Sequence, residues 1–286
     1  MAAAPHRPPT VVYIASLGHS GSTLLDLLIA SHDQAIGLGE VKNLSSRPRR
    51  RHRKRRLDEI ACDCGVSPRR ACPLWSALEE GLRRRSGLGL DDLELEDGPD
   101  ALFHAHNRAF YEAVVEASGA KVVVDSSKSL QRLARLLATP GLELRPIHLT
   151  RDPRGVAASH ARRGRAWPAT LRRWLAYERA LPRVLASREI LSVHYESLAE
   201  QPERVLAQVM EWLGLALQPG QLDWTRHVHH HLAGNPIRRE RSAEIRLDDA
   251  WRRELGPLAR ALIPLAARLA GGAPPRGRAR SPRAGA

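Results

Sequence analysis

The stretch VVYIASLGHSGSTLL, residues 11–25, decides how the rest of the sequence is interpreted. Its first five residues are β-branched or apolar, which is typical of a buried strand. Apolar residues at helical spacing begin at about residue 21, so a helix is predicted after only a short loop. The stretch therefore predicts a strand, a tight glycine-containing loop and a helix, in that order.

The loop of this unit has the composition of an oxyanion-binding site. Its two glycines, Gly18 and Gly21, permit tight backbone geometry. Consecutive N–H groups from about His19 to Thr23 are then expected to point into one concavity at the positive end of the helix. Further hydroxyl donors are Ser20, Ser22 and Thr23. Glycine and serine are also common in ordinary strand–helix turns, but the flanking strand and helix favour the oxyanion site.

Further short apolar runs, most of them followed by helical spacing, predict an α/β protein. Predicted strands are 121–125, 143–150 and 189–195, and the run 35–38 is either a strand or part of a turn. Predicted helices are about 21–32, 73–86, 129–138, 153–164, 168–187, 197–214 and 248–270. Such alternation implies a central, mostly parallel sheet with helices on both faces.

The length of 286 residues suits one large domain or two small ones. We predict a single domain over residues 10–271. An insertion at about 47–100 contains an arginine run, a cysteine loop and an acidic loop. Residues 272–286 form a Gly/Pro/Arg tail for which we expect disorder.

The net charge of +14 is concentrated in two tracts. Residues 47–56 carry eight basic side chains and residues 276–283 carry four. Removing these twelve from the 45 basic residues leaves 33 against 31 acidic ones, so the body of the chain is nearly neutral. Nucleic acid is therefore not the expected partner, although the tract 47–56 keeps polyanion binding open as an alternative.

A second phosphate site is predicted in TRDPRGVAAS, residues 150–159. Asp152 before Pro153 is a favourable helix N-cap, which places Arg151 between a strand end and a helix N-terminus. Ser159 lies about two turns further along the predicted helix. An arginine, a helix N-terminus and a serine together suit a phosphate. The same residues are explained equally well without a phosphate. In that case Arg151 pairs with a local carboxylate, and Ser159 only occupies a position in the helix.

Kinase chemistry is the main enzymatic alternative. A nucleotide-triphosphate loop of the G-x-x-x-x-G-K-[ST] type needs a lysine on the terminal phosphates. Here the residue before Thr23 is Ser22, and no lysine lies nearby. Asp125, at the end of a predicted strand, still matches a magnesium-holding aspartate, so a Mg-dependent P-loop nucleotide kinase stays open.

Together these segments resemble the sulfotransferases that use 3′-phosphoadenosine 5′-phosphosulfate. SLGHSGSTLL resembles their 5′-phosphosulfate loop, and RDPRGVAAS resembles their 3′-phosphate motif. The segment VHYESL resembles the Tyr-Glu-x-Leu segment of the family, which implies that Tyr195 lies near the adenosine. The resemblance covers residues 11–45 and 121–215, roughly half of the chain, and implies a three-layer P-loop-like fold.

The resemblance also implies catalytic residues. Gly39-Glu40 resembles the Gly-Glu segment of the tyrosylprotein-type branch, in which the glutamate is the proposed base. Lys128 resembles a lysine that follows the second strand in the same branch. His19 stands where many relatives carry Arg or Lys, so its role is expected to be weaker, pH-dependent or taken over by Lys128. The implied reaction is in-line transfer of a sulfuryl group to a hydroxyl or amine of an unidentified acceptor.

The expected donor-binding residues are His19, Ser20, Gly21, Ser22, Thr23, Arg151, Ser159 and Tyr195. We add Arg238, because the Gly-Asn-Pro-x-Arg turn at 234–238 is expected to close over the donor or the acceptor. A sulfuryl group carries less charge than a terminal phosphoryl group, so no metal ion is expected.

Three cysteines, Cys62, Cys64 and Cys72, form a C-x-C-x₇-C pattern. The usual pairs of C-x₂₋₄-C are absent, which favours a small loop with buried or occasionally paired thiols over a zinc site with His52 or another ligand. The histidines in residues 227–231 are a weaker indication of a metal site than the cysteines are, since no carboxylate partner is evident. The cysteines are few and odd in number, which fits a reducing compartment, so we expect a cytoplasmic protein without a membrane span.

Overall fold

The central element is a sheet of five parallel strands, seen in a computed structural model that describes residues 8–44, 61–186, 188–240 and 242–269. The strands are β1 Thr10–Ala15, β2 Ala35–Gly37, β3 Val122–Asp125, β4 Glu143–Thr150 and β5 Leu191–His194. Their order is β2-β3-β1-β4-β5, and every pairing is parallel. The predicted strands are confirmed, and the run 35–38 contains a short strand.

Helices cover both faces of the sheet, as a wholly parallel sheet requires. The α-helices are α1 Ser22–Ala30, α2 Pro73–Ser86, α3 Asp100–Ser118, α4 Leu130–Leu137, α5 Pro153–Ala161, α6 Trp167–Leu185, α7 Tyr195–Glu200, α8 Pro202–Trp212, α9 Trp251–Glu254 and α10 Pro257–Leu269. The 3₁₀ turns are η1 Val41–Leu44, η2 Arg69–Ala71, η3 Leu90–Asp92, η4 Trp224–Arg226 and η5 Pro236–Arg239. The predicted α/β fold with helices on both faces is confirmed.

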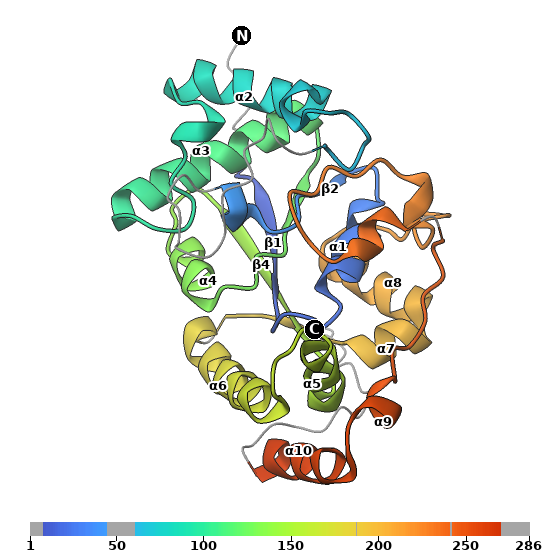
Figure 1. Cartoon of the computed structure of the whole chain (residues 1–286). Coiled ribbons are helices and arrows are strands. Elements are labelled where there is room, and N and C mark those ends of the chain that lie inside the picture. The colour runs from blue at the N-terminus through green and yellow to red at the C-terminus, as the bar shows by residue number, and fades with distance from the viewer. Residues whose placement is uncertain (1–7, 45–60, 187, 241, 270–286) are drawn as a thin grey trace, which may run out of the picture.

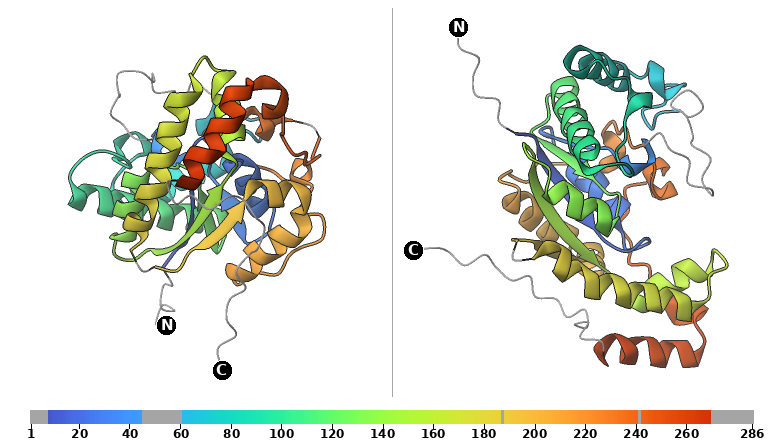
Figure 2. Two further views of the ribbon diagram at one scale, coloured as in Figure 1. Left: turned by 90° about the horizontal axis from the view of Figure 1, so that it is seen from below. Right: turned by 90° about the vertical axis from the view of Figure 1, so that its left-hand side faces the viewer.

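Alternating residues of β1 separate the two helical layers, because successive side chains of a strand point to opposite faces. Val11 and Tyr13 pack with α2, α3, α4 and the C-terminal part of α6. Val12 and Ile14 pack with α1, α7 and α8. Figures 1 and 2 show the sheet between these layers, with α5, α6 and α10 gathered at one end of the molecule.

Two predicted helices are interrupted by prolines. The predicted helix 197–214 is divided into α7 and α8, and Gln201 between them has a non-helical backbone, with φ of −137° and ψ of 59°. Pro202 follows directly, and the residue before a proline is disfavoured in the helical conformation. The predicted final helix, 248–270, likewise breaks before Pro257 into α9 and α10.

The described part of the predicted insertion, residues 61–100, shares the core of the sheet. Trp75 and Leu78 of α2 lie in the same hydrophobic cluster as Tyr13 of β1. α3, for which no helix is predicted above, follows directly and packs there too. The described part of the insertion is thus packed onto the sheet, and the single domain over residues 10–271 stays a prediction. The arginine tract, residues 47–56, and the predicted tail lie outside the described residues.

Within the described residues, every helix is too short or too polar to span a lipid bilayer.

A buried ion pair joins β3 to α3 and α4. Asp125 Oδ2 accepts hydrogen bonds from Arg132 Nε at 2.9 Å and from the Tyr111 hydroxyl at 2.7 Å. The backbone N–H of Ser127 donates to Asp125 Oδ1 at 2.9 Å. Both side chains of the Asp125–Arg132 pair are fully buried. Because both carboxylate oxygens of Asp125 are occupied by protein donors, this residue does not fit the magnesium-binding role of the kinase alternative.

Removing Arg132 should destabilise the fold strongly. Arg132→Ala leaves the Asp125 carboxylate buried without its cation, so we expect the free energy of unfolding to fall by about 3–5 kcal/mol in urea denaturation. The matched control is Arg108→Ala on α3, whose half-exposed side chain lies 3.9 Å from Glu112. That change should cost less than about 1 kcal/mol. Similar losses for the two variants would contradict the structural role of the buried pair.

Candidate functional site

The loop between β1 and α1 has the tight backbone expected of it. We call residues 16–23 the phosphate loop. His19 and Gly21 both have left-handed backbone conformations, with φ of 71° and 89°. A Cβ atom at Gly21 would lie 2.6 Å from Cδ2 of Tyr195, so the tyrosine ring packs directly on the loop backbone. Only glycine fits this position, because any side chain would both strain the backbone and displace the ring.

Arg151 connects the phosphate loop to the neighbouring strand. It follows β4, which pairs with β1, and its side chain is 6% exposed. Its Nη1 donates a hydrogen bond to the carbonyl oxygen of His19 at 3.0 Å. Its guanidinium carbon lies 4.3 Å from the centre of the Tyr195 ring, which is cation–π distance. The structure thus brings the phosphate loop, Arg151 and Tyr195 into one cluster, as predicted.

Ser159 lies on the same side of α5 as the Arg151 side chain. A Cβ atom at Gly155 would lie 2.7 Å from Arg151 Nε, so Arg151 covers the first turn of α5. Ser159 is four residues further along and therefore on the same helix face. Its buried hydroxyl lies 3.4 Å from Nη1 of Arg163. Arg163 is a cation of this region that the sequence motifs did not indicate.

The guanidinium of Arg151 is paired with an acidic residue in the free protein. Nη2 of Arg151 lies 3.0 Å from Asp248 Oδ2 and donates to the Asp248 carbonyl oxygen at 2.8 Å. The backbone N–H of Asp248 in turn donates to the Tyr195 hydroxyl at 3.1 Å. Burial by itself raises the pKa of Asp248, but Arg151 and Arg162 outweigh it and lower the pKa. No sequence signal indicates Asp248, because it lies in an irregular segment far along the chain from Arg151.

Glu40 and Lys128 meet beside the start of α1. Glu40 follows β2 and Lys128 follows β3, and these two strands are neighbours. Nζ of Lys128 donates to Glu40 Oε1 at 2.8 Å and to the Ser22 hydroxyl at 3.4 Å. Nζ of Lys42 lies 3.7 Å from Glu40 Oε2. The structure thus places the predicted base, a predicted cation and the phosphate loop together, and it adds Lys42.

The charge state of Glu40 follows from these two lysines. Burial alone raises the pKa of its carboxyl group. Lys128 and Lys42 outweigh burial, and the pKa ends below its usual value. Glu40 is therefore ionised at neutral pH, as a proton acceptor must be.

His19 is neutral at physiological pH. Burial, as the largest cause, and the nearby groups Arg163, His160, Lys128 and Arg151 together lower the pKa of its imidazole to about 4. The His160 ring packs edge-on against His19, with 4.7 Å between the ring centres. In the free protein the His19 ring therefore contributes packing against His160, and the positive charge comes from its neighbours.

The Gly-Asn-Pro-x-Arg turn reaches the phosphate loop, but Arg238 is used elsewhere. The backbone N–H of Asn235 donates to the Thr23 hydroxyl at 3.1 Å. Nε of Arg238 donates to Asp63 at 2.7 Å, and its Nη1 donates to the carbonyl oxygen of Gly234. None of the contacts that Arg238 makes with described residues is to Arg151 or its cluster. Asp63 therefore holds the Arg238 guanidinium in the free protein, and a role of Arg238 in donor binding stays a prediction.

Comparison with known proteins agrees with this geometry. A sequence model described as "Sulfotransferase family" matches residues 9–219. The chain belongs to the sulfotransferase family. The match includes the phosphate loop, Glu40, Lys128, Arg151 and Tyr195.

Curated relatives of this sulfotransferase-family chain match part of it. Carbohydrate sulfotransferase 1 of Danio rerio is 32% identical, over 36% of this chain and 30% of that protein. Carbohydrate sulfotransferase 5 of Mus musculus is 30% identical, over 44% of this chain and 40% of that protein. The chain thus spans less than half the length of these relatives.

Two solved structures share the fold. The sulfotransferase domain from the curacin biosynthetic pathway superposes with a TM-score of 0.59 at 18% identity, over 94% of this chain and all of that one. The sulfotransferase domain from the Synechococcus PCC 7002 olefin synthase gives a TM-score of 0.57 at 20% identity, over 94% and 96%. At such low identity these likenesses establish the fold of the sulfotransferase family alone.

The low pKa of His19 can be tested by NMR titration of its imidazole. We expect a midpoint near pH 4, well below the usual value of about 6.5. Arg163→Gln removes a repelling positive charge and should raise the midpoint. Arg162→Gln, at the adjacent exposed position, should leave it unchanged. A wild-type midpoint near 6.5 that does not respond to Arg163→Gln would show that the ring is not controlled by this environment.

Proposed function

We propose that this protein transfers a sulfuryl group from 3′-phosphoadenosine 5′-phosphosulfate to a hydroxyl or amine of an acceptor. The observation that carries the proposal is the meeting of Glu40 and Lys128 at the phosphate loop, beside the cluster of Arg151 and Tyr195. The residues proposed as two anion sites and a proton acceptor thus lie along one edge of the sheet. A donor with two separate phosphate positions and a transferable sulfuryl group matches this arrangement.

The donor would be held by three elements. Backbone N–H groups and hydroxyls of the phosphate loop would bind the 5′-phosphosulfate, since they lie at a helix N-terminus. Arg151 and Ser159 would bind the 3′-phosphate, with the phosphate replacing Asp248 as the partner of Arg151. The Tyr195 ring, which already packs on Gly21, would lie beside the nucleoside.

In the transfer step, Glu40 would accept the proton of the acceptor hydroxyl while the acceptor oxygen forms a bond to sulfur. The bond between sulfur and the bridging phosphate oxygen breaks in the same displacement, and the leaving 3′,5′-bisphosphate takes that electron pair. Lys128 would stabilise the charge that develops on the sulfuryl and leaving oxygens. For this it must exchange its contact with Glu40 for one with the donor, which also frees the carboxylate to accept the proton.

A metal ion has no part in this proposal. The kinase alternative depends on Asp125, whose two oxygens are bonded to Arg132, Tyr111 and Ser127. The polyanion-binding alternative depends on residues 47–56, which lie outside the described part of the chain. The sulfuryl-transfer proposal is therefore the one that the contacts of the described residues favour.

The acceptor class is proposed from the chemistry of the site and the names of relatives. A carboxylate base suits a hydroxyl acceptor, and both curated relatives are named carbohydrate sulfotransferases. Sugar hydroxyls are therefore the acceptors to test first.

The three unpaired cysteines also support our prediction of a reducing, cytoplasmic location.

Donor binding is tested by thermal denaturation with adenosine 3′,5′-bisphosphate, ADP and ATP, each with and without magnesium. We expect the 3′,5′-bisphosphate to raise the unfolding temperature most, without metal. Arg151→Ala should weaken its binding about 10- to 150-fold, because a hydrogen bond to a charged group contributes about 1.5–3 kcal/mol. The exposed Arg226→Ala should leave binding unchanged. Stronger stabilisation by ATP with magnesium would overturn the proposal.

The role of Glu40 is tested by separating binding from turnover. Glu40→Gln keeps the shape of the side chain but cannot accept a proton, so kcat should fall about 10²- to 10⁴-fold while 3′,5′-bisphosphate binding persists. The control is Glu80→Gln, an exposed position on α2 that should retain full activity. Unchanged turnover in Glu40→Gln would remove this residue from the mechanism.

A further inference from the structure

Three cysteines and a histidine from distant parts of the sequence meet outside the candidate active site. Cys62, Cys64 and Cys72 come from the loop before α2, residues 61–72, which we call the cysteine loop. His230 comes from the irregular segment between α8 and α9, and we call its residues 227–240 the strap. The Sγ atoms and His230 Nδ1 all lie within 4.8 Å of one another. Figure 1 shows the two segments side by side near β2.

Three of the distances within this group are close to those between the ligands of a tetrahedral metal site. His230 Nδ1 lies 3.3 Å from Cys72 Sγ and 3.4 Å from Cys62 Sγ, and Cys64 Sγ lies 3.6 Å from Cys72 Sγ. Zinc binds sulfur at about 2.3 Å and nitrogen at about 2.0–2.1 Å, so tetrahedral ligand atoms are roughly 3.5–3.8 Å apart. Three thiolates and one imidazole form a common structural zinc site.

A buried cation beside the group would stabilise a negatively charged metal centre. Three thiolates, a neutral imidazole and Zn²⁺ together carry one negative charge. The guanidinium of Arg69, which is 1% exposed, lies beside Cys62. It donates hydrogen bonds to three backbone carbonyls, those of Ala61, His231 and Leu232. Among the described residues, no carboxylate lies within ion-pair distance of it, and Asp63, whose charge acts on it from farther away, is paired with Arg238. The Arg69 Nε has no hydrogen-bond partner among these residues. A buried cation in this position is satisfied by an anionic metal centre.

The alternative to a metal is oxidation of two of these thiols to a disulfide, for which Cys64 and Cys72, with sulfurs 3.6 Å apart, are one candidate pair. In the structure all three cysteines are free, and the Cys64–Cys72 separation is that of non-bonded sulfurs. A disulfide would leave Cys62 and His230 without a function, whereas a metal uses all four groups. The metal is therefore the better account of the arrangement.

The group joins two segments that border the candidate active site. One residue after His230, Nε2 of His231 lies 3.0 Å from Asp26 Oδ1 of α1, and both side chains are fully buried. Further along, the strap contacts the phosphate loop through Asn235 and Thr23. Asp63, between two of the cysteines, pairs with Arg238 of the same strap. A metal at this point would fix the strap against α1 and the phosphate loop.

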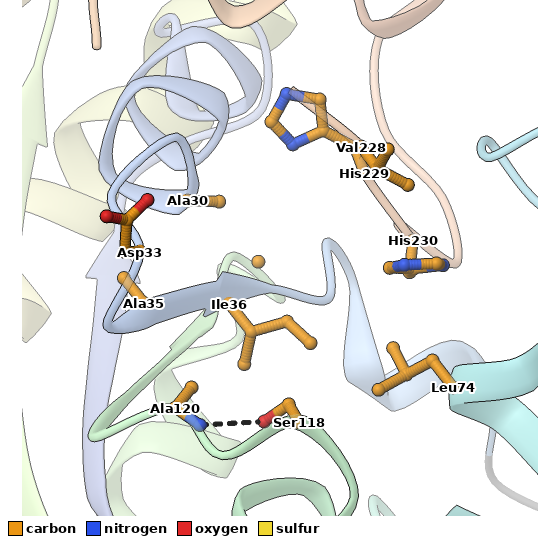
Figure 3. Close-up of a pocket in the computed structure, with 11 residues that line it drawn as sticks. Ala30, Asp33, Ala35, Ile36, Leu74, Ser118, Ala120, Val228, His229 and His230 are labelled. Atoms are coloured by element: carbon orange, nitrogen blue, oxygen red, sulfur yellow. Dashed lines mark hydrogen bonds between the residues drawn. The ribbon is translucent and has the colours of Figure 1, made fainter. Parts of the chain in front are cut away.

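We propose that Cys62, Cys64, Cys72 and His230 Nδ1 bind one structural zinc ion that clamps the cysteine loop to the strap. This proposal differs from the expectation, from the sequence, of a small loop with buried or occasionally paired thiols. The proposal does not depend on sulfuryl transfer. His230 and Leu74 also line one side of a pocket of about 220 Å³ beside β2, opposite Ala30 and Asp33 (Figure 3), which gives a chelator access to the histidine ligand. None of the site residues predicted from the sequence lines this pocket.

The test measures metal directly on the full chain, purified under reducing conditions without a histidine tag. We expect about one zinc per chain by inductively coupled plasma mass spectrometry. Replacing zinc by Co²⁺ should give the visible bands of a tetrahedral site and a thiolate-to-cobalt charge-transfer band. Cys64→Ser and His230→Ala should each lose most of the metal. The matched control, His227→Ala, replaces a half-exposed histidine of the strap outside the group and should keep it.

Chelation of the wild-type protein provides a readout that needs no variant. Removing zinc should lower the unfolding temperature, and adding zinc back should restore it, because binding to the folded state alone stabilises that state. A purified chain with three titratable thiols, no zinc and no cobalt spectrum would overturn the proposal. So would full zinc content in His230→Ala, or a Cys64–Cys72 disulfide in the reduced preparation.

Discussion

The position of β1 at the centre of a wholly parallel sheet is the constraint on which the candidate site depends. Parallel strands all end at the same edge, so the residues that follow them meet there. β1 leads into the phosphate loop, β4 into Arg151 and β3 into Lys128, and both β3 and β4 pair directly with β1. β5, next to β4, ends just before Tyr195. Groups separated by more than a hundred residues therefore lie within contact distance without any long loop to place them.

In the absence of ligand, the cations of this edge are held by protein carboxylates. Lys128 pairs with Glu40, and Arg151 pairs with Asp248. A buried cation without a partner is costly, so these pairs stabilise the free protein. An anionic ligand that binds either cation has to displace the carboxylate that is already paired with it. Only a ligand that offers charge at both positions compensates for losing both pairs, which favours a donor with two separated anionic groups.

The cysteine loop and the strap extend this logic beyond the sheet. The sheet determines where Lys128 and Arg151 lie, but the contacts over Thr23 and Arg151 come from irregular segments late in the chain. Such segments have few backbone hydrogen bonds of their own and need other restraints to hold one conformation. Here the restraints are the buried His231–Asp26 contact, the Arg238–Asp63 pair and, in our proposal, a zinc ion. Side-chain contacts thus restrain these irregular segments, which regular secondary structure does not hold in place.

The sequence by itself determined the strands, most helices and the two segments that we propose as anion-binding elements. Strand–helix periodicity and the glycine loop depend on neighbouring residues, so residues 11–25 and 150–159 could be interpreted locally. Breaks before Pro202 and Pro257, and helix α3, were missed because helical spacing continues past a proline and is obscured beside an acidic loop. Tertiary structure alone decided that Asp125 is buried against Arg132, that Asp63 holds Arg238, that Asp248 covers Arg151, and that His230 joins three cysteines. Each of these contacts joins side chains whose separation in space no local pattern encodes, because it is set by how the layers and the strap pack.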